Sequence, residues 1–213
     1  MSAPVIIAID GPAGAGKSTV ARRVAAELGI DYLDTGAMYR AVTFGVLSRE
    51  IDPSDAESVI GVCRDLELNI GVDRIVVDGV DATSVIRGPE VTSAVSAVAA
   101  TPAVRQFLVE LQRAWIRERG SGVVEGRDIT TVVLPDADHK LFVTASPRVR
   151  AERRVAESGG DVDAVEAAIA ERDRRDETRE ASPLSISSDA VVIDTSEMSI
   201  DDVVADVLAR VKG

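Results

Sequence analysis

The chain has 213 residues, of which 46% are hydrophobic and only 3% aromatic, which suits one α/β domain with an aliphatic core plus a small insert. Its 24 basic and 36 acidic residues give a net charge of −12, which opposes a broad surface for nucleic acids or membranes. Cys63 is the only cysteine, so an internal disulfide is excluded and a reducing compartment, the cytoplasm, is expected. We expect neither a signal peptide nor a membrane-spanning helix, because no apolar run approaches roughly 18 residues.

The first third of the chain alternates strand and helix signals. Residues 5–9 form a continuous apolar run, typical of a strand buried on both faces. After a glycine-rich turn, residues 17–28 predict a helix that ends at Gly29. Residues 30–34 then predict a second strand and residues 35–49 a second helix.

A different pattern interrupts this alternation. Residues 66–70 and 74–77 are separated by Gly71-Val72-Asp73 and closed by Asp78-Gly79, which predicts a hairpin. We therefore expect an inserted subdomain over residues 63–95, within a core made of residues 1–62 and 96–213.

The alternation resumes at Thr101-Pro102, which predicts a helix start. Further elements are expected as strands at 122–125, 140–143 and 190–193, a charged helical stretch at 148–179, and a last helix after Ser199. Buried strands that alternate with helices predict a three-layer α/β/α fold around a five-stranded parallel sheet. Ligands of such sheets bind at the carboxyl ends of the strands.

A complete phosphate-binding loop lies between the first strand and the first helix. The match to G-x-x-x-x-G-K-[ST] comprises Gly11, Pro12, Ala13, Gly14, Ala15, Gly16, Lys17 and Ser18. The glycines let backbone N–H groups face phosphate oxygens, and the helix N-terminus adds its dipole. Lys17 would reach the β- and γ-phosphates, and the Ser18 hydroxyl would bind Mg²⁺. The loop predicts binding of a nucleoside triphosphate with Mg²⁺.

The loop alone leaves a small-molecule kinase and a nucleotide-dependent switch or motor open. A GTPase should carry Asn-Lys-x-Asp, but none of the three lysines follows an asparagine. A mechanical ATPase would normally be larger and have an acidic pair ending its third strand, whereas this strand continues as Glu125-Gly126-Arg127-Asp128. The kinase interpretation is favoured.

Three arginine-bearing segments follow predicted strands or lie on the charged helix. They are residues 34–40, residues 125–128, and the set Arg172, Asp176 and Arg179, whose spacing would place them on one helix face. A solvated helix face with ion pairs is the alternative for this last set. Together the segments would supply cations for a second phosphate-bearing ligand.

The whole chain resembles the bacterial cytidylate kinases. Besides the phosphate loop, the resemblance rests on 33–40 (Leu-Asp-Thr-Gly-Ala-Met-Tyr-Arg), Ile86-Arg87, the stretch 98–105, Glu125-Gly126-Arg127-Asp128 and the stretch 171–179. One departure is Ile129-Thr130-Thr131, where the family often has a glycine before the threonine; we expect an altered loop there.

The resemblance implies a role for each matching residue. The catalytic set would be Lys17, Arg127, Arg172 and the lid arginines Arg153 and Arg154, within a lid of about 148–180. ATP would bind residues 11–18 together with Thr19, and Mg²⁺ would bind Ser18. The residues implied for CMP are Thr35, Tyr39, Arg40, Arg87, Ser96, Arg105, Arg127, Asp128, Arg172, Asp176 and Arg179.

The expected activity is the phosphorylation of CMP, and of dCMP, by ATP. The alternatives are another monophosphate or small-metabolite kinase, or a nucleotide-dependent switch. We expect a cytoplasmic monomer whose partners are ATP and CMP or dCMP, with no nucleic acid and no membrane.

Overall fold

The computed structural model describes residues 4–71, 74–179 and 181–212. The chain divides into two compact units. The core unit comprises Met1–Leu33 and Arg119–Gly213, and the middle unit comprises Asp34–Glu118. The predicted insert, residues 63–95, lies inside the middle unit, which extends beyond it on both sides.

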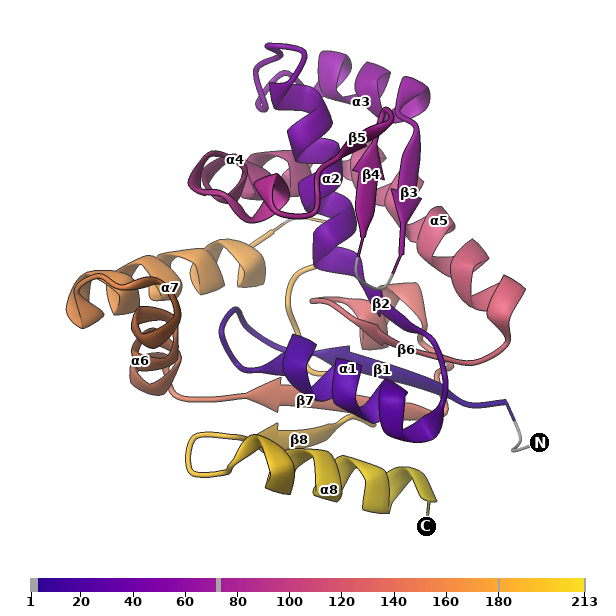
Figure 1. Ribbon diagram of the computed structural model, residues 1–213, viewed down its shortest axis with the longest axis vertical. Coiled ribbons are helices and arrows are strands. Elements are labelled where there is room, and N and C mark those ends of the chain that lie inside the picture. Colours follow the sequence, from indigo (N-terminus) through magenta and orange to yellow (C-terminus); the bar gives the residue numbers. More distant parts are fainter. Residues whose placement is uncertain (1–3, 72–73, 180, 213) are drawn as a thin grey trace. The chain divides into compact units, whose positions relative to one another are not determined.

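A five-stranded parallel sheet organises the core unit (Figure 1). Its strand order is β2-β6-β1-β7-β8. The bounds are Ile6–Asp10 for β1, Tyr32–Asp34 for β2, Gly122–Glu125 for β6, His139–Thr144 for β7 and Val191–Asp194 for β8. The central strand β1 pairs with β6 and β7, with Ile7 opposite Val123 on one side and His139 on the other. This sheet confirms the predicted α/β class, and the carboxyl ends of the strands share one edge.

Helices α1 and α8 cover one face of this sheet (Figure 1). α1 spans Lys17–Leu28 and α8 spans Ile200–Lys212. Both carry apolar side chains at helical period, so Val20 and Val24 pack with Val203 and Val207 over strand residues such as Ile9. The helix predicted over residues 17–28 has the bounds found, and Gly29 ends it with a φ of 65°.

The charged stretch predicted over residues 148–179 is two helices in the structure. α6 spans Pro147–Ser158 and α7 spans Val162–Glu177. The break falls at Gly159 and Gly160, which have φ values of 73° and 115°. Because α7 ends at Glu177, the prediction that Arg179 shares a helix face with Arg172 and Asp176 is wrong: Arg179 follows the helix.

The segment after Arg127-Asp128 forms a π-helical turn, η2, over Ile129–Val133. Two i→i+5 hydrogen bonds define it, from Val133 N to Asp128 O and from Leu134 N to Ile129 O. This turn stands where we expected only an altered loop.

The middle unit packs helices against a small antiparallel sheet. Its helices are α2 (Thr35–Leu47), α3 (Ala56–Asp65), the 3-10 turn η1 (Val85–Arg87), α4 (Pro89–Ala100) and α5 (Pro102–Arg119, whose last residue belongs to the core unit). Its strands are β3 (Leu68–Ile70), β4 (Ile75–Val77) and β5 (Val80–Asp81). Ala37 and Ala41 of α2 pack with Ile75, Val77 and Ile86 in its core.

The predicted hairpin is confirmed as the antiparallel pair β3–β4, in which Leu68 faces Val77. Its predicted turn at 71–73 includes residues 72 and 73, which lie outside the described residues. Asp78 and Gly79 have φ values of 50° and 77° and lead into a third strand, β5. The Asp-Gly pair is therefore a hairpin turn of its own and not the end of the sheet.

Within the described ranges, no single helix is both long and apolar enough to cross a membrane. One bent pair, α4 and α5, passes the same length and composition test, with an angle of 96° between the two helices.

Candidate active site

The phosphate loop has the conformation that its glycines predict. Gly11, Gly14 and Gly16 have φ values of 145°, 77° and 86°, a region that side chains other than glycine rarely adopt. A Cβ atom at Gly11 would lie 1.9 Å from the carbonyl oxygen of Val143 in β7. The loop therefore requires glycine at this first position for space as well as for backbone angle.

Lys17 begins α1 and folds back over the loop. Its side chain is buried, and its Nζ donates to the Pro12 carbonyl oxygen at 2.8 Å. Gly16 occupies the N-cap position of α1 and supplies no side-chain cap. The first N–H groups of α1 thus face the loop together with an ammonium group, an arrangement that favours a phosphate.

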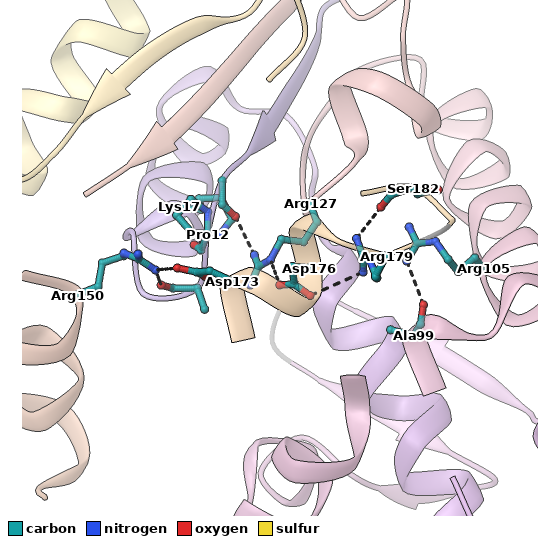
Figure 2. Close-up of polar contacts among 12 residues, drawn as sticks. Pro12, Lys17, Ala99, Arg105, Arg127, Arg150, Asp173, Asp176, Arg179 and Ser182 are labelled. Atoms are coloured by element: carbon teal, nitrogen blue, oxygen red, sulfur yellow. Dashed lines mark hydrogen bonds and ion pairs between the residues drawn. The ribbon is translucent and has the colours of Figure 1, made fainter. Parts of the chain in front are cut away.

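Arg127, which follows β6, contacts the phosphate loop directly. Its Nη1 donates to the Gly11 carbonyl oxygen at 2.9 Å, and its Nε donates to Asp176 Oδ2 at 2.9 Å (Figure 2). Asp176 Oδ1 lies 3.9 Å from Nη1 of Arg179, whose Nη2 donates to the Ser182 carbonyl oxygen. The structure therefore brings together three residues predicted for the acceptor: Arg127, Asp176 and Arg179.

A group of positive charges surrounds Arg172 of α7. Burial lowers the pKa of the Arg172 guanidinium, and the neighbouring charges of Arg127 and Arg154 lower it further, against the opposing effect of Asp176. Arg172 Nε is buried and has no acceptor within the described residues. A buried N–H group that lacks an acceptor, in a group of charges that includes three arginines, is suited to binding an anion.

An ion pair ties α6 and α7, the two helices in the range predicted for the lid, to the phosphate loop. Arg150 of α6 contacts Asp173 Oδ2 of α7 at 2.6 Å, and both side chains are largely buried (Figure 2). The Arg150 guanidinium also donates to the Ala13 carbonyl oxygen at 3.1 Å and to the Ala145 carbonyl oxygen at 2.9 Å. One arginine thus fixes α6, α7 and the phosphate loop together.

The two predicted lid arginines differ in their surroundings. Arg154 is exposed and contributes to the charges around Arg172. Arg153 instead donates to Oγ1 and to the carbonyl oxygen of Thr195, at 3.0 and 2.7 Å. Thr195 follows β8, and its hydroxyl lies 3.3 Å from the Ala15 carbonyl oxygen. In this conformation Arg153 is bound beside the phosphate loop and not at the Arg172 group.

Asp128, which follows Arg127 in the core unit, is buried, and the other residues predicted for the acceptor belong to the middle unit. Arg40 of α2 donates to the Ile86 carbonyl oxygen at 3.0 Å and to Thr92 Oγ1 at 2.8 Å. Arg87 contacts Asp34 Oδ2 at 3.0 Å, and the other oxygen of Asp34 caps α2 by accepting from Ala37 N. These contacts hold Arg87 at the N-cap of α2 and fix Arg40, in the middle of α2, to the segment 86–92.

Arg105 and Tyr39 form a second group in the middle unit. The Arg105 guanidinium lies 5.4 Å from the centre of the Tyr39 ring and donates to the Ala99 carbonyl oxygen at 3.3 Å. Both side chains are buried, as is Thr35 on the same helix as Tyr39, whereas Ser96 on α4 is half-buried. Arg105, Tyr39 and Thr35 are thus held inside the middle unit.

Three residues at the site were not predicted: Asp10, Arg150 and Asp173. Asp10 ends β1 with its carboxylate fully buried, and an acidic residue directly after an apolar run is a signal that could have found it. Asp173 lies in the Glu171-Arg172-Asp173 motif, and Arg150 lies one helical turn before Arg154. Their partners are far away in sequence, so the pairing itself required the fold.

The amino-acid sequence matches a known protein family. The family model described as cytidylate kinase matches residues 7–213. A curated protein named cytidylate kinase from Mycobacterium leprae is 51% identical over 213 residues, covering 98% of this chain and 96% of the relative. Another, from Corynebacterium efficiens, is 52% identical over 208 residues, covering 93% and 90%.

Solved structures agree on the fold. A shikimate kinase from Bacteroides thetaiotaomicron superposes with a TM-score of 0.53, covering 98% of this chain and 99% of its own. The sequence identity is only 11%, so this likeness bears on the fold alone.

Proposed function

Because the chain belongs to the cytidylate kinase family, we propose that it transfers the γ-phosphoryl group of ATP to CMP, giving ADP and CDP. We include dCMP as a second acceptor. The observation that carries the proposal is the environment of Arg172: burial and the charges of Arg127 and Arg154 lower the pKa of its guanidinium, and its buried Nε lacks an acceptor within the described residues. This group lies at the phosphate loop, since Arg127 is bonded to Gly11.

The charges around Arg172 suit phosphoryl transfer between two phosphate-bearing substrates. The transferred group passes through a state in which negative charge spreads over its oxygens, and prearranged cations stabilise that charge. Guanidinium groups also bind phosphate through two parallel hydrogen bonds. We assign Arg127 and Arg172 to the acceptor phosphate and Arg154, with Arg153 after a lid movement, to the transferring group.

On the donor side, the proposal assigns the ATP phosphates to the backbone of residues 11–16, to Lys17 and to the first turn of α1 with Ser18 and Thr19. Lys17 exchanges its Pro12 partner for the β- and γ-phosphate oxygens. Mg²⁺ is part of the proposal, because the Ser18 hydroxyl is an exposed oxygen donor at this end of α1, the ligand type that Mg²⁺ prefers. The Ser18 hydroxyl would hold the ion, which would supply positive charge against that of the phosphates.

On the acceptor side, each unit contributes its own residues to the proposal. In the core unit, Asp176 accepts from the ribose hydroxyls, while Asp128 and Arg179 read the base. The residues proposed from the middle unit, where residues 63–95 are taken as the CMP-binding insert, are Thr35, Tyr39, Arg40, Arg87, Ser96 and Arg105. The family membership supports this assignment, as do the buried positions of Thr35, Tyr39 and Arg105.

The proposed reaction requires little acid–base chemistry. The nucleophile is an oxygen of the CMP phosphate, whose second pKa is about 6, so it is ionised at neutral pH. The main barrier is the electrostatic repulsion between the two phosphate groups as they approach, and the positive charges of Lys17 and the arginines offset this repulsion. The proposed enzyme is a monomer in the cytoplasm, and the single free cysteine, Cys63, fits the reducing compartment.

A coupled assay of ADP release tests the proposal. Purified protein with ATP and Mg²⁺ is offered CMP, dCMP, UMP, AMP, GMP and shikimate in turn. We expect the highest kcat/KM with CMP, followed by dCMP. ADP release that does not depend on any acceptor would instead support a nucleotide-dependent switch.

A matched pair of variants tests the observation on which the proposal rests. Arg172→Gln should raise the KM for CMP and lower kcat, because the variant loses a cation at the anion site. Arg175→Gln is the control, since Arg175 lies on the same helix but is exposed and pairs with Glu171. Equal activity in the two variants would contradict the role of the Arg172 group.

A further inference from the structure

Asp10 is a buried carboxylate that the proposed reaction does not use. It is the last residue of β1 and has no exposed surface. Both of its oxygens accept hydrogen bonds from the π-helical turn η2. Oδ1 accepts from Ile129 N at 2.9 Å, and Oδ2 accepts from Thr130 N and Thr130 Oγ1, each at 2.7 Å.

These bonds join the two segments that must be aligned for phosphoryl transfer. Asp10 directly precedes Gly11, the first residue of the phosphate loop, and η2 directly follows Arg127 and Asp128. Gly11 in turn accepts from Arg127 Nη1 at 2.9 Å. Four hydrogen bonds therefore fix the segment 127–130 to the start of the phosphate loop, and three of them end on one side chain.

The Asp10 carboxylate matches its three donors in a way that an amide cannot. An ionised carboxylate has two accepting oxygens and no proton of its own, whereas an amide would present an NH₂ group to one set of donors. Burial raises the pKa of Asp10, while the hydrogen bonds from Thr130 and Ile129 oppose this rise. Burying a carboxylate costs free energy because the group loses its bonds to water, and the three bonds from η2 offset that cost. Since they form only when η2 has this conformation, they favour it over others.

We propose that Asp10 is a positioning residue that sets the Arg127 guanidinium against the phosphate loop by holding the η2 turn. The proposal rests on the proposed function, in which Arg127 binds the acceptor phosphate. Asp10 itself contacts neither substrate. It fixes the main chain at Ile129 and Thr130, just after Arg127, while Asp176 and Gly11 accept hydrogen bonds from the Arg127 guanidinium group.

The kinetic test compares Asp10→Asn with two threonine variants of the same turn. Asp10→Asn should lower kcat by at least ~10-fold with the KM for ATP within about twofold, because displacing a catalytic group by about 1 Å can cost ~100-fold. Thr130→Val, which removes one donor to Asp10, should lower kcat in the same direction. Thr131→Val is the control, since the Thr131 hydroxyl is buried without a partner within the described residues.

A double-mutant cycle separates positioning from a general loss of structure. If Asp10 acts through Arg127, Asp10→Asn should have almost no further effect on kcat in an Arg127→Ala background, because coupled residues are not additive. Independent, multiplying effects on kcat would overturn the proposal. If Asp10→Asn does not fold, Thr130→Val takes its place in the same cycle.

A spectroscopic readout decides the proposal even if CMP is not the acceptor. The Arg127 Nε–H resonance, assigned by its loss in Arg127→Lys, reports the bond to Asp176. The rate at which this Nε–H proton exchanges with water should rise at least tenfold in Asp10→Asn and stay unchanged in Thr131→Val. An unaltered resonance in Asp10→Asn would overturn the positioning role. Absence of CMP turnover in the unmodified protein would instead refute the proposed function.

Discussion

The Lys17 ammonium is held inside its own loop by a backbone oxygen. Its bond to the Pro12 carbonyl oxygen gives the buried charge a hydrogen-bond acceptor within the loop. The residue thus requires little rearrangement to meet a phosphate, and such prearranged charges contribute most to transition-state stabilisation.

Replacing this lysine tests the donor site. Lys17→Ala should lower kcat at least ~100-fold, because loss of one prearranged charge costs about 3 kcal/mol. Binding of CMP should survive, since Lys17 serves ATP. Steady-state kinetics measures kcat, and calorimetric titration measures the affinity for CMP. Near-normal turnover would contradict the donor-site assignment.

Asp128, buried beside Arg127, is the residue proposed to select the base. Cytosine presents an amino donor at position 4, whereas uracil presents an acceptor there. An ionised carboxylate only accepts, so it favours cytosine. Asp128→Ala should therefore narrow the preference for CMP over UMP by about 1–3 kcal/mol. The measurement is kcat/KM for both acceptors in both proteins, and an unchanged ratio would show that Asp128 does not read the base.

Among the elements, α6 and α7 are joined by two kinds of ion pair. The Arg150–Asp173 pair is largely buried and reaches the phosphate loop. A second connection runs from Arg148 to Asp163 and Glu166 on the exposed side. Buried pairs are costly to break because one charge is left without its partner, whereas exposed pairs contribute little.

This difference predicts unequal effects of two similar substitutions. Asp173→Asn should lower the free energy of unfolding by about 2–4 kcal/mol, since it leaves Arg150 buried without its counter-charge. Asp163→Asn, which removes an exposed partner of Arg148, should cause no measurable loss. Urea denaturation followed by circular dichroism compares them, and equal stability of the two variants would contradict the role of the Arg150–Asp173 pair.

The elements that could be predicted are those with a strong local pattern. Continuous apolar runs indicated the strands of the parallel sheet, and glycines marked the end of α1 and the phosphate loop. The break between α6 and α7 was missed although Gly159-Gly160 lies there, because charged residues continue on both sides. Helices α3 and α4 were also missed, although Val59, Val62 and Cys63 of α3 form a buried face.

For the whole molecule, the residues of the site could be named from motifs, but their partners could not. The bonds from Asp10 to Thr130 and from Arg150 to Ala13 join positions 120 and 137 residues apart. Such contacts depend on the strand order β2-β6-β1-β7-β8, which places the ends of β1, β6 and β7 next to one another. Nor did the local pattern reveal that residues 34–118 form one compact unit larger than the hairpin insert.

The central claim is that the phosphoryl group leaves ATP and arrives on the phosphate of CMP. Phosphorus-31 NMR of a mixture of the protein, ATP, Mg²⁺ and CMP observes donor and acceptor together. We expect the CMP signal to be replaced by the two signals of CDP, with one ADP formed for each CDP. Formation of ADP and inorganic phosphate while the CMP signal stays unchanged would contradict the account.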